Sequence, residues 1–115
     1  HYAGAFPTWL APVQAKVMTI TDAQIPFGKK VAQNLRDAGY RVESDFRNEK
    51  IGKKIREAQL AKVPYTLVIG AREMESSQVA LRVRGKGDVG VLALEEVMSQ
   101  IRSDVESRAF SPGEN

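Results

Sequence analysis

The part of the chain whose side chains could do chemistry is the basic run at residues 45–56. Its lysines at positions 50, 53 and 54 recur at spacings of three and four, which would place them on one face of a helix. The first turn of a helix has unpaired backbone N–H groups and the positive end of the helix dipole, and both favour an anion. The segment therefore indicates a phosphate contact, although a solvated basic helix face would show the same pattern.

Basic residues gather in the middle of the chain. Between Lys29 and Lys62 there are ten basic residues and five acidic ones, a local net charge of +5. Since the net charge of the chain is +3, the remaining residues sum to −2. Such asymmetry favours a polyanionic partner, because each neutralised phosphate releases counterions. Charge that serves only solubility is the alternative, and composition by itself favours that alternative.

Catalytic arrangements are scarce in this sequence. The single histidine is His1, so no histidine general base, nucleophilic triad or histidine metal cluster can be assembled. Cysteine is absent, which excludes disulfides and thiolate chemistry and fits a reducing compartment. The glycine-rich run at residues 85–88 lacks the spacing of a phosphate-binding loop. We therefore expect neither catalytic residues nor a metal site here.

The elements that must position the basic run alternate between strand and helix. Apolar or alternating stretches predict strands at residues 13–20, 41–45, 65–69, 78–84 and 90–92. Apolar residues at helical spacing predict three helices, which follow the first, second and fifth strands. We expect Asp22 to cap the first helix and Gly39 to end it. We expect Asn48 to cap the second, and residues 71–75 to form a turn.

The resulting order is β-α-β-α-β-β-β-α, an α/β fold with a mixed five-stranded sheet and three helices. Three of the strands are parallel and joined by right-handed crossovers, and the last two form a hairpin. Ligands of open sheets gather outside the carboxyl ends of the parallel strands. The candidate site therefore consists of the loops at residues 20–22, 46–50 and 70–73.

Length and composition bound the domain organisation. A chain of 115 residues with 43% hydrophobic and 27% charged residues fits one compact domain. We interpret residues 1–12 as an ordered lead-in, residues 13–110 as the domain and residues 111–115 as a frayed tail. No apolar run approaches the roughly 20 residues of a membrane helix, and no signal peptide is recognisable. We expect a cytoplasmic protein without a membrane partner.

Two runs, residues 45–56 and VPYTLVIG at residues 63–70, resemble the anticodon-binding domain that several class II aminoacyl-tRNA synthetases share. That group includes the prolyl, histidyl, glycyl and threonyl enzymes. The segments that resemble the C-terminal anticodon-binding domain of the threonyl-tRNA synthetases are FPTWLAPVQ at 6–14, RNEKIG at 47–52, KIRE at 54–57 and VALR at 79–82. The resemblance covers residues 2–110 and implies the class II anticodon-binding fold.

The resemblance implies recognition of the threonine anticodon loop, whose second and third bases are G and U. An arginine can bond two acceptors of guanine, a carboxylate can accept from guanine N–H groups, and an asparagine offers uracil both a donor and an acceptor. The positions that match the family's anticodon-binding residues are Asn48, Lys50, Glu73 and Arg82, with Ile20 as an apolar neighbour. Basic residues that are possible phosphate contacts are Arg47, Lys53, Lys54 and Arg84.

The resemblance also implies a parent enzyme that uses ATP to attach threonine to tRNA. ATP, zinc and magnesium would then belong to a separate catalytic core domain, joined to this chain through residues 1–12, and we expect no cofactor in this chain. The expected partners are the anticodon stem-loop of threonine tRNA and that core. One alternative is a free-standing accessory subunit of the same fold. A small nucleotide-binding α/β enzyme is a weaker alternative, because the phosphate loop and the histidines are missing.

Overall fold

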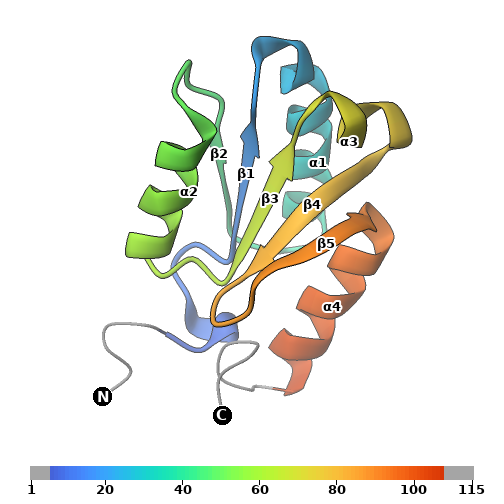
Figure 1. The fold of residues 1–115 in the computed structure, drawn as a ribbon. Coiled ribbons are helices and arrows are strands. Elements are labelled where there is room, and N and C mark those ends of the chain that lie inside the picture. Colours follow the sequence, from blue (N-terminus) through green and yellow to red (C-terminus); the bar gives the residue numbers. More distant parts are fainter. Residues whose placement is uncertain (1–5, 108–115) are drawn as a thin grey trace.

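The computed structural model describes residues 6–107 and shows one mixed five-stranded sheet (Figure 1). The strands are β1 (Ala15–Thr19), β2 (Val42–Asp45), β3 (Tyr65–Ile69), β4 (Gln78–Val83) and β5 (Gly87–Ala93). Their order across the sheet is β2-β1-β3-β4-β5. β1 pairs in parallel with β2 and β3, whereas β4 is antiparallel to β3 and to β5. The predicted mixed-sheet α/β fold is confirmed.

Helices cover both faces of the sheet. On one face, α1 (Ile25–Asp37) and α4 (Leu94–Ser107) enclose the larger core, which includes Val17, Leu35 and Ile101. On the other face, α2 (Ile51–Leu60) packs Ala58 against Met18 in a smaller core. Val17 and Met18 are neighbours in β1 and face opposite sides, as the two-residue repeat of a strand requires. Because both faces are covered, β3 is buried along its whole length.

The third connection contains a helix that the sequence pattern did not predict. The predicted turn at residues 71–75 is wrong, because Ala71–Ser76 form a short helix, α3. Its start is capped by Glu73, whose Oε1 accepts the Gly70 N–H at 2.8 Å. Its end is marked by Ser77 in the left-handed conformation, with φ of 57°. The fold therefore has one helix more than the three expected.

The start of α1 also differs from the expectation. A 3-10 turn at Asp22–Gln24 precedes the helix, and its N-cap residue is Thr21. The Thr21 N–H donates to Gln24 Oε1 at 2.7 Å, which closes the cap. Asp22 is the first residue of this turn, and the N-cap position of α1 itself is Gln24, so the prediction that Asp22 caps the helix is wrong. Gly39 follows the end of α1 with φ of 96°, so its predicted role as a helix terminator is confirmed.

The start of α2 lies two residues later than predicted. Lys50 occupies the N-cap position and the helix begins at Ile51. The predicted cap, Asn48, lies in the preceding loop and is exposed to solvent. The prediction that Asn48 caps α2 is therefore wrong.

The described part of the lead-in begins at Phe6 and includes one turn of 3-10 helix, Thr8–Leu10. Arg41 donates to the carbonyl oxygens of Trp9 at 3.0 Å and of Ala11 at 2.9 Å. Arg84, at the end of β4, donates to the carbonyl oxygen of Phe6. Two arginines from distant parts of the chain thus hold the lead-in against the lower end of the sheet.

A β-bulge interrupts the pairing of β4 with β5. Leu81 pairs with Gly90 and Arg82 with Asp88, so Val89 is an extra residue on β5. Gly90 has φ of 111°, a conformation that glycine adopts without strain. Because a bulge increases the local twist, the hairpin bends beside Arg82.

Among residues 6–107, no helix has the length and apolar character needed to span a membrane. The predicted domain boundary at residue 110 and the predicted tail at residues 111–115 lie outside the described residues.

Candidate nucleic-acid interface

The three parallel strands end level with one another at the upper edge of the sheet in Figure 1. β1 and β2 pair up to Met18 and Asp45, and β1 and β3 pair up to Thr19 and Ile69. The loops that leave these strands are therefore neighbours, as the topology predicts. The predicted anticodon-binding residues that follow this edge are Ile20, Asn48, Lys50 and Glu73.

Ile20 and Glu73 approach each other over the bare backbone of Gly70. A methyl group added at Gly70 would lie 2.8 Å from Ile20 Cδ1 and 3.0 Å from Glu73 Oε1. The Ile20 side chain remains 47% exposed, so it forms an apolar surface beside the carboxylate. Glu73 uses Oε1 to cap α3, and Oε2 can accept a hydrogen bond from a ligand.

An ion-pair network holds the loop that follows β2. Arg47 Nε and Nη2 donate to Asp45 Oδ1 and Oδ2, each at 2.8 Å, and Nη2 also donates to Glu57 of α2. The Arg47 hydrogen bonds lower the pKa of the Asp45 carboxyl, and the same bonds raise the pKa of the Arg47 guanidinium. A phosphate contact through Arg47 would have to compete with two carboxylates.

Lys50 and Lys53 are exposed at the start of α2. Lys53 pairs with Glu49 at 3.2 Å, and this contact lowers the pKa of the Glu49 carboxyl. An exposed ion pair contributes little to stability, so Lys53 can exchange Glu49 for a phosphate at small cost.

Lys54 points into the protein, away from the exposed basic surface of α2. Lys54 is only 1% exposed. Its Nζ donates to the carbonyl oxygens of Thr19 at 2.9 Å and Asp45 at 3.2 Å. An ammonium buried among backbone carbonyls cannot reach a phosphate in solvent. The prediction that Lys54 contacts phosphate is therefore wrong, and so is the placement of positions 50, 53 and 54 on one exposed face.

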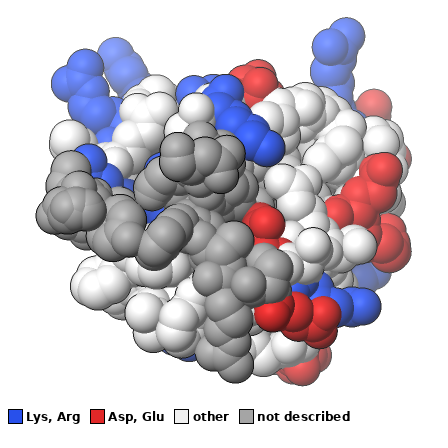
Figure 2. All heavy atoms as spheres, turned by 90° about the horizontal axis from the view of Figure 1, so that it is seen from below, with Lys and Arg blue, Asp and Glu red and all other residues white. Residues whose placement is uncertain are grey.

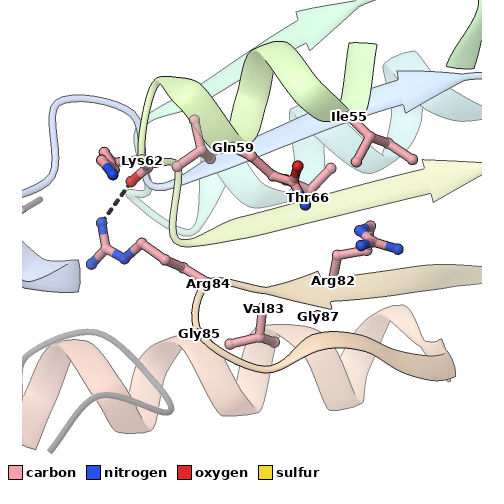
Figure 3. A pocket seen from close by; sticks show the side chains of 10 residues that line it. Ile55, Gln59, Lys62, Thr66, Arg82, Val83, Arg84, Gly85 and Gly87 are labelled. Atoms are coloured by element: carbon pink, nitrogen blue, oxygen red, sulfur yellow. Dashed lines mark hydrogen bonds between the residues drawn. The ribbon is translucent and has the colours of Figure 1, made fainter. Parts of the chain in front are cut away.

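Arg82 lies apart from these loops, on the sheet face that α2 covers. It pairs with Thr66, three residues before the end of β3, which is about 10 Å from the upper edge. Beside it, between α2 and β4, is a hollow of about 340 Å³ (Figure 3). Side chains that line it include Ile55, Gln59, Lys62, Thr66, Arg82 and Arg84. A second hollow of about 120 Å³ shares Ile55 and Arg82.

Arg84 lies two residues beyond Arg82, toward the opposite end of the sheet. Its Nη1 donates to the carbonyl oxygen of Lys62 at 2.6 Å (Figure 3), and Nη2 donates to that of Phe6. The guanidinium thus has a structural use at the lower end of the sheet. A phosphate contact through Arg84 stays a prediction.

The chemistry of this arrangement is that of binding. Amide, carboxylate, ammonium and guanidinium groups offer donors and acceptors beside the apolar Ile20. Within residues 6–107, no group of three or more histidine or acidic side chains is placed to hold a metal ion.

Comparison with known proteins assigns the fold to a family. Residues 10–104 match the family model described as the anticodon binding domain. The match runs from the lead-in to α4 and includes all three loops at the upper edge. The chain belongs to the anticodon-binding domain family.

Individual relatives of this anticodon-binding domain are aminoacyl-tRNA synthetases. It is 54% identical over 108 residues to a threonine–tRNA ligase of Clostridium tetani, a match that covers 94% of this chain and 17% of that relative. The RNA binding domain of a threonyl-tRNA synthetase from Cryptosporidium parvum superposes with a TM-score of 0.84 at 35% identity, over 90% of this chain and 26% of that one. A prolyl-tRNA synthetase of the same organism gives 0.78 at 27% identity, over 90% and 23%.

The anticodon-binding domain carries its charges unevenly. Figure 2 views it from below, and acidic side chains gather on the right, the side on which α4 lies. Basic side chains gather along the upper rim of this view. The acidic residues that α4 contributes are Glu95, Glu96, Asp104 and Glu106. The side of the domain that carries α4 is thus the less favourable one for RNA.

The burial of Lys54 in the anticodon-binding domain follows from a spacing in the sequence. Position 54 lies three residues after Ile51 and four before Ala58, and both of those pack in the smaller core. No comparable spacing in the sequence predicts that Gln59 and Lys62 line the hollow. The hollow forms where α2 meets β4, and these elements are distant in sequence.

Proposed function

We propose that this chain is the anticodon-recognition module of a threonine–tRNA ligase, and that it reads G and U at the second and third anticodon positions of threonine tRNA. The observation that carries the proposal is the 54% identity to a threonine–tRNA ligase over 94% of a chain that belongs to the anticodon-binding family. That relative is about six times as long as the match, so the proposed module is one part of a larger enzyme.

The candidate residues for base recognition lie in two places: the loops at the upper edge of the sheet, and β4, which carries Arg82. Guanine suits Arg82, which can bond two of its acceptors, and Glu73, which can accept from its N–H groups. Uracil suits the amide of Asn48, and Ile20 offers either base an apolar contact. The separation of Arg82 from the upper edge fits single-stranded bases that are splayed apart, which is how proteins read RNA loops.

Exposed lysines support this reading electrostatically. Lys50 follows Asn48 closely and can bind a base or a phosphate, and Lys53 can bind a phosphate. In the whole enzyme, activation of threonine with ATP, together with zinc and magnesium, would belong to the catalytic core. We propose that this core is joined to the module through residues 1–12. We also propose that the enzyme is cytoplasmic.

Titration with anticodon stem-loops tests the proposal. The matched loop has G and U at the second and third positions, and two others each carry a different base at one of them. We expect each change to weaken binding roughly thirtyfold, the middle of the range for a lost base contact. A fully paired hairpin is the control for binding through phosphates alone. Equal affinity for all loops, or no binding at low salt, would overturn the proposal.

A further inference from the structure

We infer that Lys54 is a positioning residue for anticodon recognition: its buried ammonium fixes the loop after β1 and the loop after β2 relative to each other. The inference rests on the proposed function, because these two loops carry Ile20 and Asn48.

The contacts of Lys54 lie at the roots of both loops. Its Nζ donates to the carbonyl oxygens of Thr19 at 2.9 Å and Asp45 at 3.2 Å, the last residues of β1 and β2. The residues that follow them, Ile20 and Phe46, are the first of the two loops. One ammonium, carried by α2, therefore joins both points at which the chain leaves the sheet.

Burying the Lys54 ammonium costs free energy, so packing alone does not explain a lysine at this position. Removing an ammonium from water is unfavourable unless hydrogen bonds replace its hydration, and Lys54 is 1% exposed. An unbranched apolar side chain of similar length would fill the same space without that penalty. What the apolar side chain could not do is donate hydrogen bonds to the carbonyl oxygens of Thr19 and Asp45 at the ends of β1 and β2.

A second set of contacts holds the β2 loop from its other side. The Asp45 carboxylate accepts both Arg47 bonds, and Arg47 also bonds Glu57 of α2. Phe46 packs against α1, since a methyl group at Gly28 would lie 2.9 Å from its ring. Asn48 thus lies between Arg47 and the start of α2, in a loop that contacts helices on both faces of the sheet.

The loop after β3 is anchored differently. Glu73 caps α3 through Gly70, and Ile20 covers Gly70. This loop meets the loop after β1 at Ile20, whose N–H also donates to the Ile69 carbonyl oxygen at 3.0 Å, and no hydrogen bond from Lys54 to it is seen among the described residues. Loss of the Lys54 ammonium should disturb recognition through Asn48 more than recognition through Arg82, which lies on β4.

A double-mutant cycle tests this inference. Lys54→Met removes the ammonium and keeps the aliphatic chain, and Lys30→Met is the matched control at an exposed lysine of α1. Affinities for the matched loop and the loop changed at the third base are measured for each variant, with and without Asn48→Ala. We expect Lys54→Met to lower third-base discrimination roughly fivefold, with little further loss on adding Asn48→Ala. Lys30→Met should change neither quantity.

Outcomes separate positioning from a general effect on folding. If the losses from Lys54→Met and Asn48→Ala multiply independently, or if discrimination is unchanged in folded Lys54→Met, positioning through Lys54 is overturned. Should Lys54→Met not fold, Arg47→Lys loosens the same loop from its exposed side and enters the same cycle. Its loss must then also fail to multiply with that of Asn48→Ala.

Amide hydrogen exchange without RNA separates this inference from the proposed function. Lys54→Met should speed exchange at residues 20–22 and 46–50 and leave β4 unchanged. If the unmutated chain does not discriminate between loops, the proposed function fails, whatever the exchange shows. If it discriminates but exchange in the two loops is unaltered by Lys54→Met, only the positioning role fails.

Discussion

Polar side chains are used in opposite ways at the two ends of the sheet. At the lower end, Arg41 and Arg84 donate to backbone carbonyls of the lead-in, so their charges hold the chain in place. At the upper end, Asn48 and Lys50 are exposed beyond the ends of the parallel strands. Lys54 is the exception at the upper end, because its ammonium donates to the carbonyl oxygens of Thr19 and Asp45.

The contrast is sharpest where β4 ends. Arg82 is in β4 and Arg84 follows its last residue. Both line the larger hollow, but Arg84 donates to the carbonyl oxygens of Phe6 and Lys62, whereas Arg82 also lines the second hollow. Their identical chemistry makes them a matched pair for separating binding from stability.

Arg82→Ala should have the largest effect on recognition. We expect it to lower discrimination at the second anticodon base by roughly 1 to 3 kcal/mol, because a bidentate contact to guanine is lost. Stem-loop titration measures this loss, and the free energy of unfolding should hardly change. Lys53→Ala is the control: it should weaken all loops alike and flatten the salt dependence. A base-selective effect of Lys53→Ala would contradict the contrast.

Arg84→Ala should have the reverse profile. We expect the free energy of unfolding to fall by about 1.5 kcal/mol, because two charged hydrogen bonds to carbonyls are lost from a partly exposed site. Urea denaturation measures this change. Discrimination between loops should remain as in the unmutated chain. A selective loss at one base would place Arg84 in the interface and remove the distinction between the two ends.

Gly70→Ala should have a smaller effect, confined to the upper end. The added methyl group would push the flexible tips of Ile20 and Glu73 aside, since they lie 2.8 and 3.0 Å from its position. We expect discrimination to fall by about 1 kcal/mol, near the lower limit for a lost base contact. Gly52→Ala is the control, because nothing lies within 4 Å of the added methyl group there. Unchanged discrimination in Gly70→Ala would exclude Ile20 and Glu73 from the interface.

The smallest expected effect is the contribution of Asp45 to the free energy of unfolding at low pH. The folded state holds the pKa of Asp45 below the unfolded value of 3.8, mainly through the Arg47 hydrogen bond. Its contribution to stability is therefore complete above about pH 4 and is lost as the pH falls through the folded pKa. Comparing unfolding of the unmutated chain with Asp45→Asn from pH 7 to pH 2 should show a difference that shrinks at the acid end. A difference independent of pH would contradict this role.

Patterns that depend on neighbouring residues were readable in the sequence. Pro64 and Gly70 bound an apolar run, so β3 is predicted at its observed limits. Helix caps are less certain to predict, because Thr21 and Asp22 are adjacent residues that can both accept a backbone N–H. The six residues of α3 are too few to show a helical period.

The candidate site is predictable to the same extent as the topology. The parallel strand order indicates the upper edge and hence the loops with Ile20 and Asn48. The use of each cation is not predictable in that way, because it depends on carbonyl groups from distant segments. Lys54 meets Thr19, 35 positions away, and Arg84 meets Phe6, 78 positions away.

Val89 is a position where a change in the length of β5 would alter the curvature of the β4–β5 hairpin. It is the one residue of β5 without a counterpart on β4, and the bulge that it creates lies beside Arg82. Deleting it would leave Arg82 opposite Asp88 and Val83 opposite Gly87 while straightening the hairpin. A single-codon deletion would thereby change the curvature of the wall beside the hollow and replace none of its side chains. A change of length, as well as a substitution, can therefore reshape the surface beside Arg82.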